Sequence, residues 1–419
     1  MVHHTMNTKM KKAALASSIN HNISVSPMSF TRLSLPVLAT IVALSLAACT
    51  STPLTPPVVP PTTTQKPATP ETPVQGLQKS NFAAMPGWDR DEIHDAWPAF
   101  MTSCQTLGKR NEWRLVCASA RQINANDDNA IRAFFESNFT PYKVFNADGS
   151  DTGLVTGYYE PLLRGARKRS GAYQTPLYRA PDDLLTIDLT SVYPDLKGMR
   201  LRGRVVGNKV VPYFSRAEML QSGALAGKEL VWVDDPVEAF FLQVQGSGRV
   251  YLSDTQETIR LAFADQNGYP YKSIGRYLVD KGEMTLSQAS AQGIKAWVIA
   301  NPGRQNELLN VNPSYIFFKE EKISDPSKGP NGAMGLPLTG QRSIAVDPQH
   351  IPLGAPVFLA TTQPNSDAPM QRLVLAQDTG GAIRGAVRAD FFWGFGNEAG
   401  EKAGRMKQRG MMWVLLPNS

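Results

Sequence analysis

The middle of the chain consists of short β-rich runs separated by glycine and asparagine-glycine turns. The runs are GLVTGYYEPLL, GRVVGNKVVPYF, ELVWVDD, AFFLQVQGSGRVYLS and TIRLAFADQNG, and they occupy roughly residues 157–272. Runs this short, with turn residues between them, are typical of a small β-barrel or sandwich. Helical and β segments do not alternate regularly along the chain, which disfavours a doubly wound α/β sheet.

Helical patterns flank this β-rich block on both sides. DNAIRAFFESNF precedes it with an amphipathic stripe, and TLSQASAQGIKAWVIAN follows it with Thr285 as its expected cap. The last hundred residues return to strands, with one helix, NEAGEKAGRMKQRG, that we expect to end at Gly410. We predict a mainly β fold with helical additions, in which a β-barrel domain of residues 157–272 is inserted between the two halves of a first domain, 80–156 and 273–419. A cleft would lie between the two domains.

The composition excludes two classes of function. The chain has 419 residues, enough for roughly two or three domains, and 42% of them are apolar. Four basic residues and no acid precede Cys49, so the remaining 39 of the 43 basic residues stand against 36 acids, which gives no case for nucleic-acid binding. Only His94 and His350 lie beyond residue 49, and neither belongs to an HxxxH or CxxC array. We therefore expect no metal site and no cofactor.

The apolar run LSLPVLATIVALSLAAC ends in small residues that lead to Cys49 and resembles the lipobox of a bacterial lipoprotein signal. A membrane helix is the alternative. The sixteen residues 33–48, interrupted by Pro36, are shorter than the ~20 that span a bilayer. We expect residues 1–48 to be a cleaved signal peptide, with Met28 as an alternative start, and Cys49 to be lipidated.

The residues after Cys49 bear on where such an anchor would place the protein. The residue after the cysteine is Thr50 and not an acidic residue of the kind that retains a lipoprotein in the inner membrane. We therefore expect the protein to lie at the periplasmic face of the outer membrane. The Pro/Thr-rich linker of residues 49–79 cannot bury a core, and it is either an extended tether or a tail without a purpose. Composition does not separate these two interpretations.

Cys104 and Cys117 are the two cysteines that remain after Cys49. They lie in two segments of helical period joined by a short polar link. In an oxidising compartment a disulfide is the expected state, and two free buried thiols are the alternative.

Three aspartates occupy matched positions in the C-terminal strands: Asp347 ends RSIAVD, Asp378 ends RLVLAQD, and Asp390 follows a turn. Together with VTGYYEP, FFLQVQGSGRV, YKSIGRYLVDKGE and NPSYIFFKE, they resemble the membrane-bound lytic transglycosylase A family, from about residue 80 to 417. The resemblance implies a double-psi β-barrel that carries the aspartates, an inserted second β-barrel and a groove between them. It also implies cleavage of the β-1,4 bond between N-acetylmuramic acid and N-acetylglucosamine in peptidoglycan, with a 1,6-anhydromuramoyl product and no cofactor. The single catalytic acid of the family matches Asp390.

The residues around Asp390 suit such a role. Phe391, Phe392 and Trp393 follow it, and an apolar surrounding raises the pKa of a carboxyl group. Glycosidases normally need two carboxyl groups, but one suffices if the 6-hydroxyl of the sugar attacks C1. Asp378 would either assist by raising the pKa of Asp390 through like-charge repulsion or cap the TGGAIRG turn.

The substrate-contact residues are open to two interpretations. Glycines allow a sugar chain to approach the backbone and amides or hydroxyls bind its polar groups, but tight hairpins also need glycine, and strand tyrosines often belong to a core. Trp393 would either be a sugar platform, on which a sugar ring stacks, or form the part of the cleft wall that excludes water from Asp390. The candidates are Tyr158, Gln245, Gly246, Ser247 and Trp393, with Tyr159 as a second tyrosine beside the first.

Two rival functions remain. Asp378-Thr379-Gly380 follows an apolar strand and matches the aspartic-protease signature. A protease pair would require a second such loop, but the other D-T-G of the chain, Asp151-Thr152-Gly153, follows the polar run NADGS rather than an apolar strand. The other rival is a peptidoglycan-binding outer-membrane lipoprotein without catalysis. We expect a monomer that binds peptidoglycan glycan strands and no nucleic acid, with cell-wall synthesis or hydrolysis complexes as candidate protein partners.

Overall fold

The computed structural model describes residues 76–323 and 325–418. The predicted signal peptide, its alternative start at Met28, the lipidation site Cys49 and most of the predicted linker lie outside the described residues. Within the described part, no helix combines the length and the apolar character needed to span a membrane.

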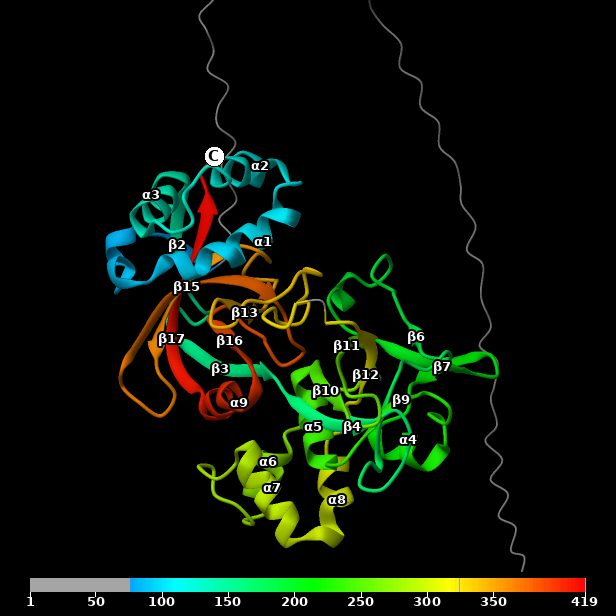
Figure 1. Ribbon diagram of the computed structural model, residues 1–419. Helices are drawn as coiled ribbons and strands as arrows, with labels where there is room; N and C mark the ends of the chain where they lie inside the picture. Colours follow the sequence, from blue (N-terminus) through cyan, green and yellow to red (C-terminus); the bar gives the residue numbers. More distant parts are fainter. Residues whose placement is uncertain (1–75, 324, 419) are drawn as a thin grey trace, which may run out of the picture. The chain divides into compact units, whose positions relative to one another are not determined.

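One eight-stranded sheet forms the first part of the fold (Figure 1). Its strands follow the order β1-β2-β17-β14-β15-β13-β16-β3, and β17 also pairs with β3, so the six strands from β17 to β3 close into a barrel. The barrel confirms the predicted mainly β fold. The strands are β1 Leu77–Lys79, β2 Phe139–Val144, β3 Gly153–Glu160, β13 Ser343–Val346, β14 Pro356–Thr362, β15 Pro369–Asp378, β16 Arg388–Phe395 and β17 Lys407–Pro417.

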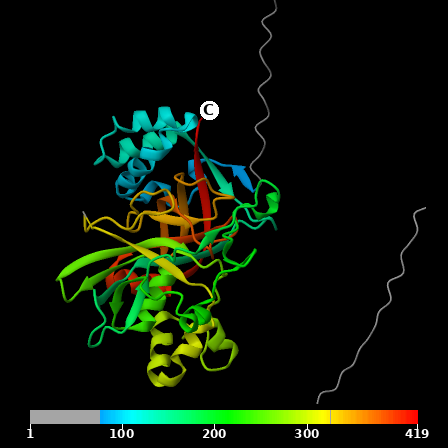
Figure 2. The same cartoon turned by 90° about the vertical axis from the view of Figure 1, so that its right-hand side faces the viewer.

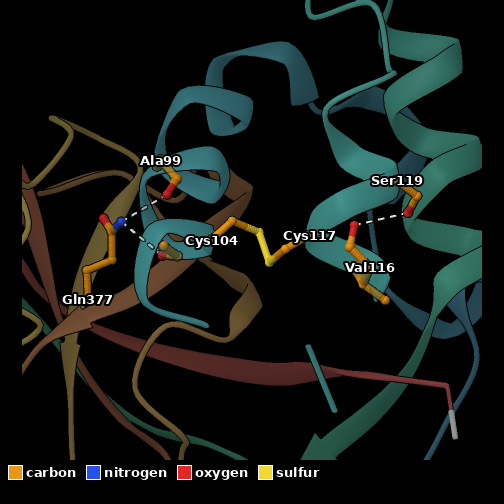
Figure 3. Close-up of a disulfide and its surroundings, with 7 residues drawn as sticks. Ala99, Cys104, Val116, Cys117, Ser119 and Gln377 are labelled. Carbon is orange, nitrogen blue, oxygen red and sulfur yellow. Dashed lines mark hydrogen bonds between the residues drawn. A yellow bond between two sulfur atoms is a disulfide. The ribbon is translucent and has the colours of Figure 1, made fainter. Parts of the chain in front are cut away.

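Three helices, α1 (Trp97–Leu107), α2 (Asn111–Ala120) and α3 (Asp128–Asn138), gather at one end of the barrel, as both views of the molecule show (Figures 1 and 2). Helix α1 packs beside β15, α2 beside β17 and α3 beside β2. Their buried aromatic residues share one core with the barrel strands. A disulfide between Cys104 and Cys117 joins α1 to α2, with 5.4 Å between the two Cα atoms (Figure 3).

The second part is a six-stranded sheet in the order β12-β11-β10-β4-β9-β5, and an isolated bridge between Arg179 and Phe318 brings its two ends together. A three-stranded sheet and helix α4 lie in the long connection between β5 and β9. The elements are β4 Leu162–Ala166, β5 Thr175–Tyr178, β6 Leu185–Thr186, β7 Arg202–Val206, β8 Lys209–Pro212, α4 Arg216–Ser222, β9 Glu229–Val233, α5 Pro236–Gln245, β10 Gly248–Leu252, β11 Glu257–Gln266 and β12 Ile316–Glu321.

The predicted boundary at residue 272 falls inside this second part. Strand β12 pairs with β11 along most of its length, although the three helices α6 (Ile274–Asp280), α7 (Ala291–Ala300) and α8 (Gln305–Asn310) separate them in sequence. These helices share a hydrophobic core with α5. The inserted part therefore extends structurally to β12, at residue 321.

Three local predictions were wrong. The run that contains FFLQVQ forms α5 rather than a strand, because Asp235 caps it through bonds to the amides of Val237 and Glu238 and Pro236 takes its first position. Helix α7 is capped by Ser290 rather than Thr285. Helix α9 (Gly396–Arg405) ends before Gly410, which lies within β17.

A buried ion cluster lies where the chain passes from the first sheet to the second. Glu160 ends β3 and is fully buried, and its carboxylate accepts bonds from Nε of Arg249 (2.9 Å) and Nε of Arg260 (2.5 Å). Both guanidinium groups also donate to the carbonyl oxygen of Lys328. Removal of any one partner would leave buried charge uncompensated and would therefore destabilise the junction of the two sheets.

Candidate active site

Asp390 occupies the middle of β16, between β13 and β3. Strands β16 and β3 are parallel, and their register places Asp390 opposite Thr156, whose hydroxyl donates to Oδ1 of Asp390 at 2.6 Å. The carboxyl group is partly buried. Burial raises the pKa of Asp390, against the opposing effects of the Thr156 bond and the positive charge of Arg388. The carboxyl group is therefore favoured in its protonated form compared with an ordinary aspartate.

Arg388 reaches the same threonine. Its Nη2 donates to Oγ1 of Thr156 at 2.9 Å, and its Nη1 donates to backbone carbonyl oxygens of Leu154 and Ala389. Thr156 thus accepts from a guanidinium and donates to the carboxyl group, which fixes the direction of its hydroxyl proton. Burial lowers the pKa of Arg388, although Asp390 raises it.

Asp378 ends β15 and is held by three donors. The backbone amides of Ala333 and Thr379 donate to Oδ1 at 3.0 and 2.9 Å, and the hydroxyl of Tyr158 donates to Oδ2 at 3.0 Å. Burial raises the pKa of Asp378 to about 6, with these bonds opposing the rise and the charge of Asp390 adding to it. The repulsion between the two acids therefore acts on Asp378, whereas the raised pKa of Asp390 has burial as its cause.

Tyr158 contacts both Phe392 of β16 and the carboxylate of Asp378. Its ring packs on Phe392 at a centroid distance of 5.1 Å, and burial raises the pKa of its hydroxyl well above 10. The hydroxyl consequently stays protonated and keeps donating to Asp378. Thr156 and Tyr158 both project from β3, two residues apart, so one strand presents a donor to each aspartate.

A cleft of about 650 Å³ contains these groups. Its walls come from the barrel and from the inserted part, as the sequence led us to expect. The barrel supplies Tyr158, Ala345, Asp378, Arg388, Asp390 and the loop 379–384; the inserted part supplies residues 198–201, Arg216, residues 243–246, Phe263, Gln266 and residues 268–271, with Asn312, Ser314 and Ile316 from the approach to β12.

The structure brings some of the predicted contact residues into the cleft. Tyr158, Gln245 and Gly246 line it, whereas Ser247 and Tyr159 do not. The side-chain oxygen of Gln245 accepts from the backbone amide of Tyr159 at 3.1 Å, which orients the amide nitrogen of Gln245. Gly246 is the C-cap of α5, with φ of 83°, rather than part of a hairpin turn.

Trp393 belongs to the core and not to the cleft wall. It is 5% exposed, its Nε1 donates to Sδ of Met406 at 3.3 Å, and its ring packs edge-on against Phe391 at 4.9 Å. Successive side chains of β16 point to opposite faces, so Phe391 and Trp393 face inward while Asp390 and Phe392 share the other face. The interpretation of Trp393 as a sugar platform is therefore wrong, and of the three aromatics Phe392 alone packs beside Tyr158.

The third aspartate of the C-terminal pattern supports a loop. Asp347 is 4% exposed, and its carboxylate accepts from the backbone amides of Gly385 (2.9 Å) and Gln349 (3.2 Å). The first bond anchors the end of the 379–384 loop that lines the cleft. Within residues 76–323 and 325–418, no group of three His, Cys, Asp or Glu side chains is arranged to hold a metal ion.

Comparisons with known proteins match both parts of the fold. Residues 154–319 match the MltA specific insert domain, and residues 342–416 match the 3D domain. The membrane-bound lytic murein transglycosylase A of Escherichia coli K12 is 32% identical over 281 residues, which cover 65% of this chain and 68% of the relative. The chain belongs to the membrane-bound lytic murein transglycosylase A family.

Solved structures agree with this assignment. A lytic transglycosylase of Burkholderia pseudomallei, LtgG, is 49% identical, with a TM-score of 0.57 over 82% of this chain and 96% of that one. The E. coli family member with bound chitohexaose is 26% identical, with a TM-score of 0.62 over 82% of this chain and 95% of that one. Both aspartates lie within the 3D domain of this transglycosylase A family member, whereas Tyr158 and Gln245 lie within the insert match.

Proposed function

We propose that this chain is a lytic transglycosylase that cleaves the β-1,4 bond between N-acetylmuramic acid and N-acetylglucosamine in peptidoglycan and leaves a 1,6-anhydromuramoyl end. The observation that carries the proposal is Asp390, an acid with a raised pKa that lies in a cleft between two β-rich parts and is oriented by Thr156. The similar E. coli and B. pseudomallei proteins are lytic transglycosylases, which supports this reaction, and the chitohexaose bound in the E. coli structure supports a glycan ligand.

Asp390 performs both proton transfers in this mechanism. The protonated carboxyl group gives its proton to the glycosidic oxygen as the bond from that oxygen to C1 breaks. The resulting carboxylate then takes the proton of the 6-hydroxyl, whose oxygen forms the new bond to C1. The proton returns to Asp390 and no water is added, so the reaction needs no second carboxylate of the kind that hydrolases use.

The neighbours of Asp390 position it and hold the sugar. Thr156 keeps one carboxyl oxygen fixed, so the other oxygen is the one that faces the substrate. Asp378, which accepts three bonds, assists by holding Tyr158 in the cleft wall. We assign substrate contacts to Tyr158, to the amide nitrogen of Gln245 and to the backbone at Gly246, the predicted contact residues that line the cleft.

We further propose how the chain is organised around this site. The catalytic barrel comprises the segments up to the end of β3 at Glu160 and after residue 321, and the inserted part between them binds the glycan. A signal peptide that ends at residue 48, a lipidated Cys49 and a linker to residue 79 would anchor a monomer at the periplasmic face of the outer membrane. The E. coli relative is a membrane-bound protein, which agrees with an anchor.

The products of purified wall sacculi test the proposed reaction. A transglycosylase should clear the suspension and release muropeptides that are one water lighter than hydrolytic products. Reducing muramic ends would instead indicate a two-carboxylate hydrolase with Asp378 as the partner. Binding without clearing would indicate a non-catalytic peptidoglycan-binding lipoprotein.

A further inference from the structure

The cleft contains more positive charge than its acids balance. Four arginines line it, against two aspartates: Arg200, Arg216, Arg384 and Arg388. Among the described residues, none of the four forms an ion pair within 4.0 Å. The imbalance grows when Asp378 and Asp390, both with raised pKa, are protonated.

Arg216 and Arg388 have hydrogen-bond partners within the protein, and these partners account for their presence in the cleft. Arg216 is buried, donates to the carbonyl oxygens of Asn312 and Ser314 and to the side chain of Gln243, and lies between two aromatic rings. Arg388 holds Thr156. These two cations are therefore part of the framework of the cleft.

Arg200 has no such explanation. It is partly buried in the loop before β7, and among the described residues its side chain forms no hydrogen bond and no ion pair. Its guanidinium carbon lies 5.9 Å from the centre of the Phe263 ring. Burial lowers the pKa of Arg200, and the neighbouring charge of Arg384 lowers it further. Arg200 comes from the inserted part and Arg384 from the 379–384 loop of the barrel, and both line the same cleft. An anion bound by both guanidinium groups would offset their mutual repulsion.

The acids near this pair are already engaged. Asp265 accepts from Nε of Arg202 at 2.8 Å, and Asp378 has three donors of its own. Arg384 donates with Nη1 only, to the carbonyl oxygens of Gly380 (3.1 Å) and Ile383 (2.9 Å), so its Nη2 and Nε have no partner among the described residues. A guanidinium with free N–H groups is the side chain that best fits a carboxylate, because its fork bonds both oxygens.

We propose that Arg200 and Arg384 form a carboxylate-binding site in the cleft, which recognises the acidic substituent of the muramoyl residue and favours acidic glycan over neutral glycan. This inference rests on the proposed function. The carboxylate has two possible sources: the peptide stem, or the lactyl group of a muramoyl residue whose stem has been removed. A chitooligosaccharide has neither.

Calorimetric binding with three soluble glycans of equal sugar length tests the site and separates these sources. The glycans are a stem-bearing strand, an amidase-stripped strand with free lactyl carboxylates, and a chitooligosaccharide. The full-length protein carries Asp390→Asn so that the ligands are not consumed. Arg200→Gln and Arg384→Gln are compared with Arg164→Gln, which removes an exposed arginine of β4 outside the cleft.

We expect Arg200→Gln and Arg384→Gln each to raise the Kd for an acidic strand about 10-fold, the scale of one lost hydrogen bond to a charged group. The Kd for chitooligosaccharide should stay within about 2-fold, and Arg164→Gln should change neither. A loss confined to stem-bearing strands assigns the stem carboxylate, and a loss on stripped strands assigns the lactyl group. Equal loss on acidic and neutral glycans, or no loss on either acidic strand, would overturn the inference.

Thermal unfolding distinguishes a binding role from a structural one. A structural arginine would destabilise the fold when removed, whereas Arg200→Gln relieves repulsion and should leave the Tm unchanged or raise it. A lowered Tm would contradict the proposal. If the parent protein binds none of the three glycans, both the proposed function and this inference are wrong; if it binds them and Arg200→Gln does not discriminate, only the inference fails.

Discussion

Thr156 donates a hydrogen bond of 2.6 Å to Asp390 across the parallel pairing of β3 and β16. The two residues are 234 positions apart in sequence, and the closure of the barrel brings them together. The bond lowers the pKa of Asp390 and opposes the effect of burial. Thr156 therefore tunes the acid and also fixes its orientation.

Thr156→Val should shift the pH profile of turnover upward. Valine keeps the shape of threonine but removes the donor, so the pKa of Asp390 rises further and the alkaline limb, where the acid loses its proton, moves to higher pH. Turnover at the optimum should fall about 10-fold, because the carboxylate is no longer oriented. Thr186→Val, at an exposed site in β6, is the control. An unchanged or lowered alkaline limb would show that this bond does not act on the catalytic acid.

Asp378→Asn should remove a pH-dependent loss of stability. The pKa of Asp378 is about 6 in the folded protein and 3.8 in its ordinary state, so the folded state favours the protonated form. Its contribution is fully present below about pH 4 and is lost as the pH rises through 6. The stability of the parent relative to Asp378→Asn should therefore decline between pH 4 and 6 in chemical denaturation, and the variant should lose turnover only partially. A parent that gains on the variant over this window would contradict the raised pKa.

Local patterns predicted the elements whose partners are close in sequence. The helices around Cys104 and Cys117 and the β7–β8 hairpin depend on period and turn residues that single segments display. Helix α5 was mistaken for a strand because a short apolar run does not separate the two, although Asp235 and Pro236 at its start were an available helix signal.

The site depended on pairings that local patterns do not contain. The resemblance indicated Asp390, but the role of Thr156 and the place of Arg388 follow from strand register over long separations. The pairing of β11 with β12 across three helices likewise places the end of the inserted part at residue 321 and not at the predicted residue 272. Strand alternation alone predicts that Phe391 and Trp393 point away from the face that carries Asp390, and this argument was available from the sequence.

Cys104 and Cys117 should appear as a linked pair in non-reducing peptide maps of protein exported through its own signal. The bridge closes a loop with a sequence separation of 13, so the double variant Cys104→Ser/Cys117→Ser should lose about 3 kcal/mol of unfolding free energy. The bridged helix α1 also holds Gln377, beside Asp378, through bonds to Ala99 and Ser103 (Figure 3). Free thiols on both cysteines in the exported protein would refute the pairing.

Cys49→Ala should yield a soluble enzyme that keeps its activity on isolated murein. Stable attachment to a bilayer requires more than one acyl chain, and this variant has none. Fractionation should move the protein from the membrane to the soluble pool, while turnover of soluble glycan stays unchanged because the cleft lies in the barrel and the inserted part. Abolished turnover would show that the N-terminal region does more than anchor the protein.

Asp390→Asn should abolish turnover and preserve binding. Asparagine has almost the same shape and still accepts the bond from Thr156, but it has no acidic proton to give to the glycosidic oxygen. The rate of murein clearing should fall at least ~100-fold, the scale of one lost general acid, with sugar affinity within about 3-fold of the parent. Asp367→Asn, an exposed aspartate in the loop between β14 and β15, is the matched control and should clear murein at the parental rate. Mass analysis of the parental products should show the loss of one water, because the 6-hydroxyl has closed on C1. If Asp390→Asn retains near-normal turnover, Asp390 is not the acid, whatever the products are.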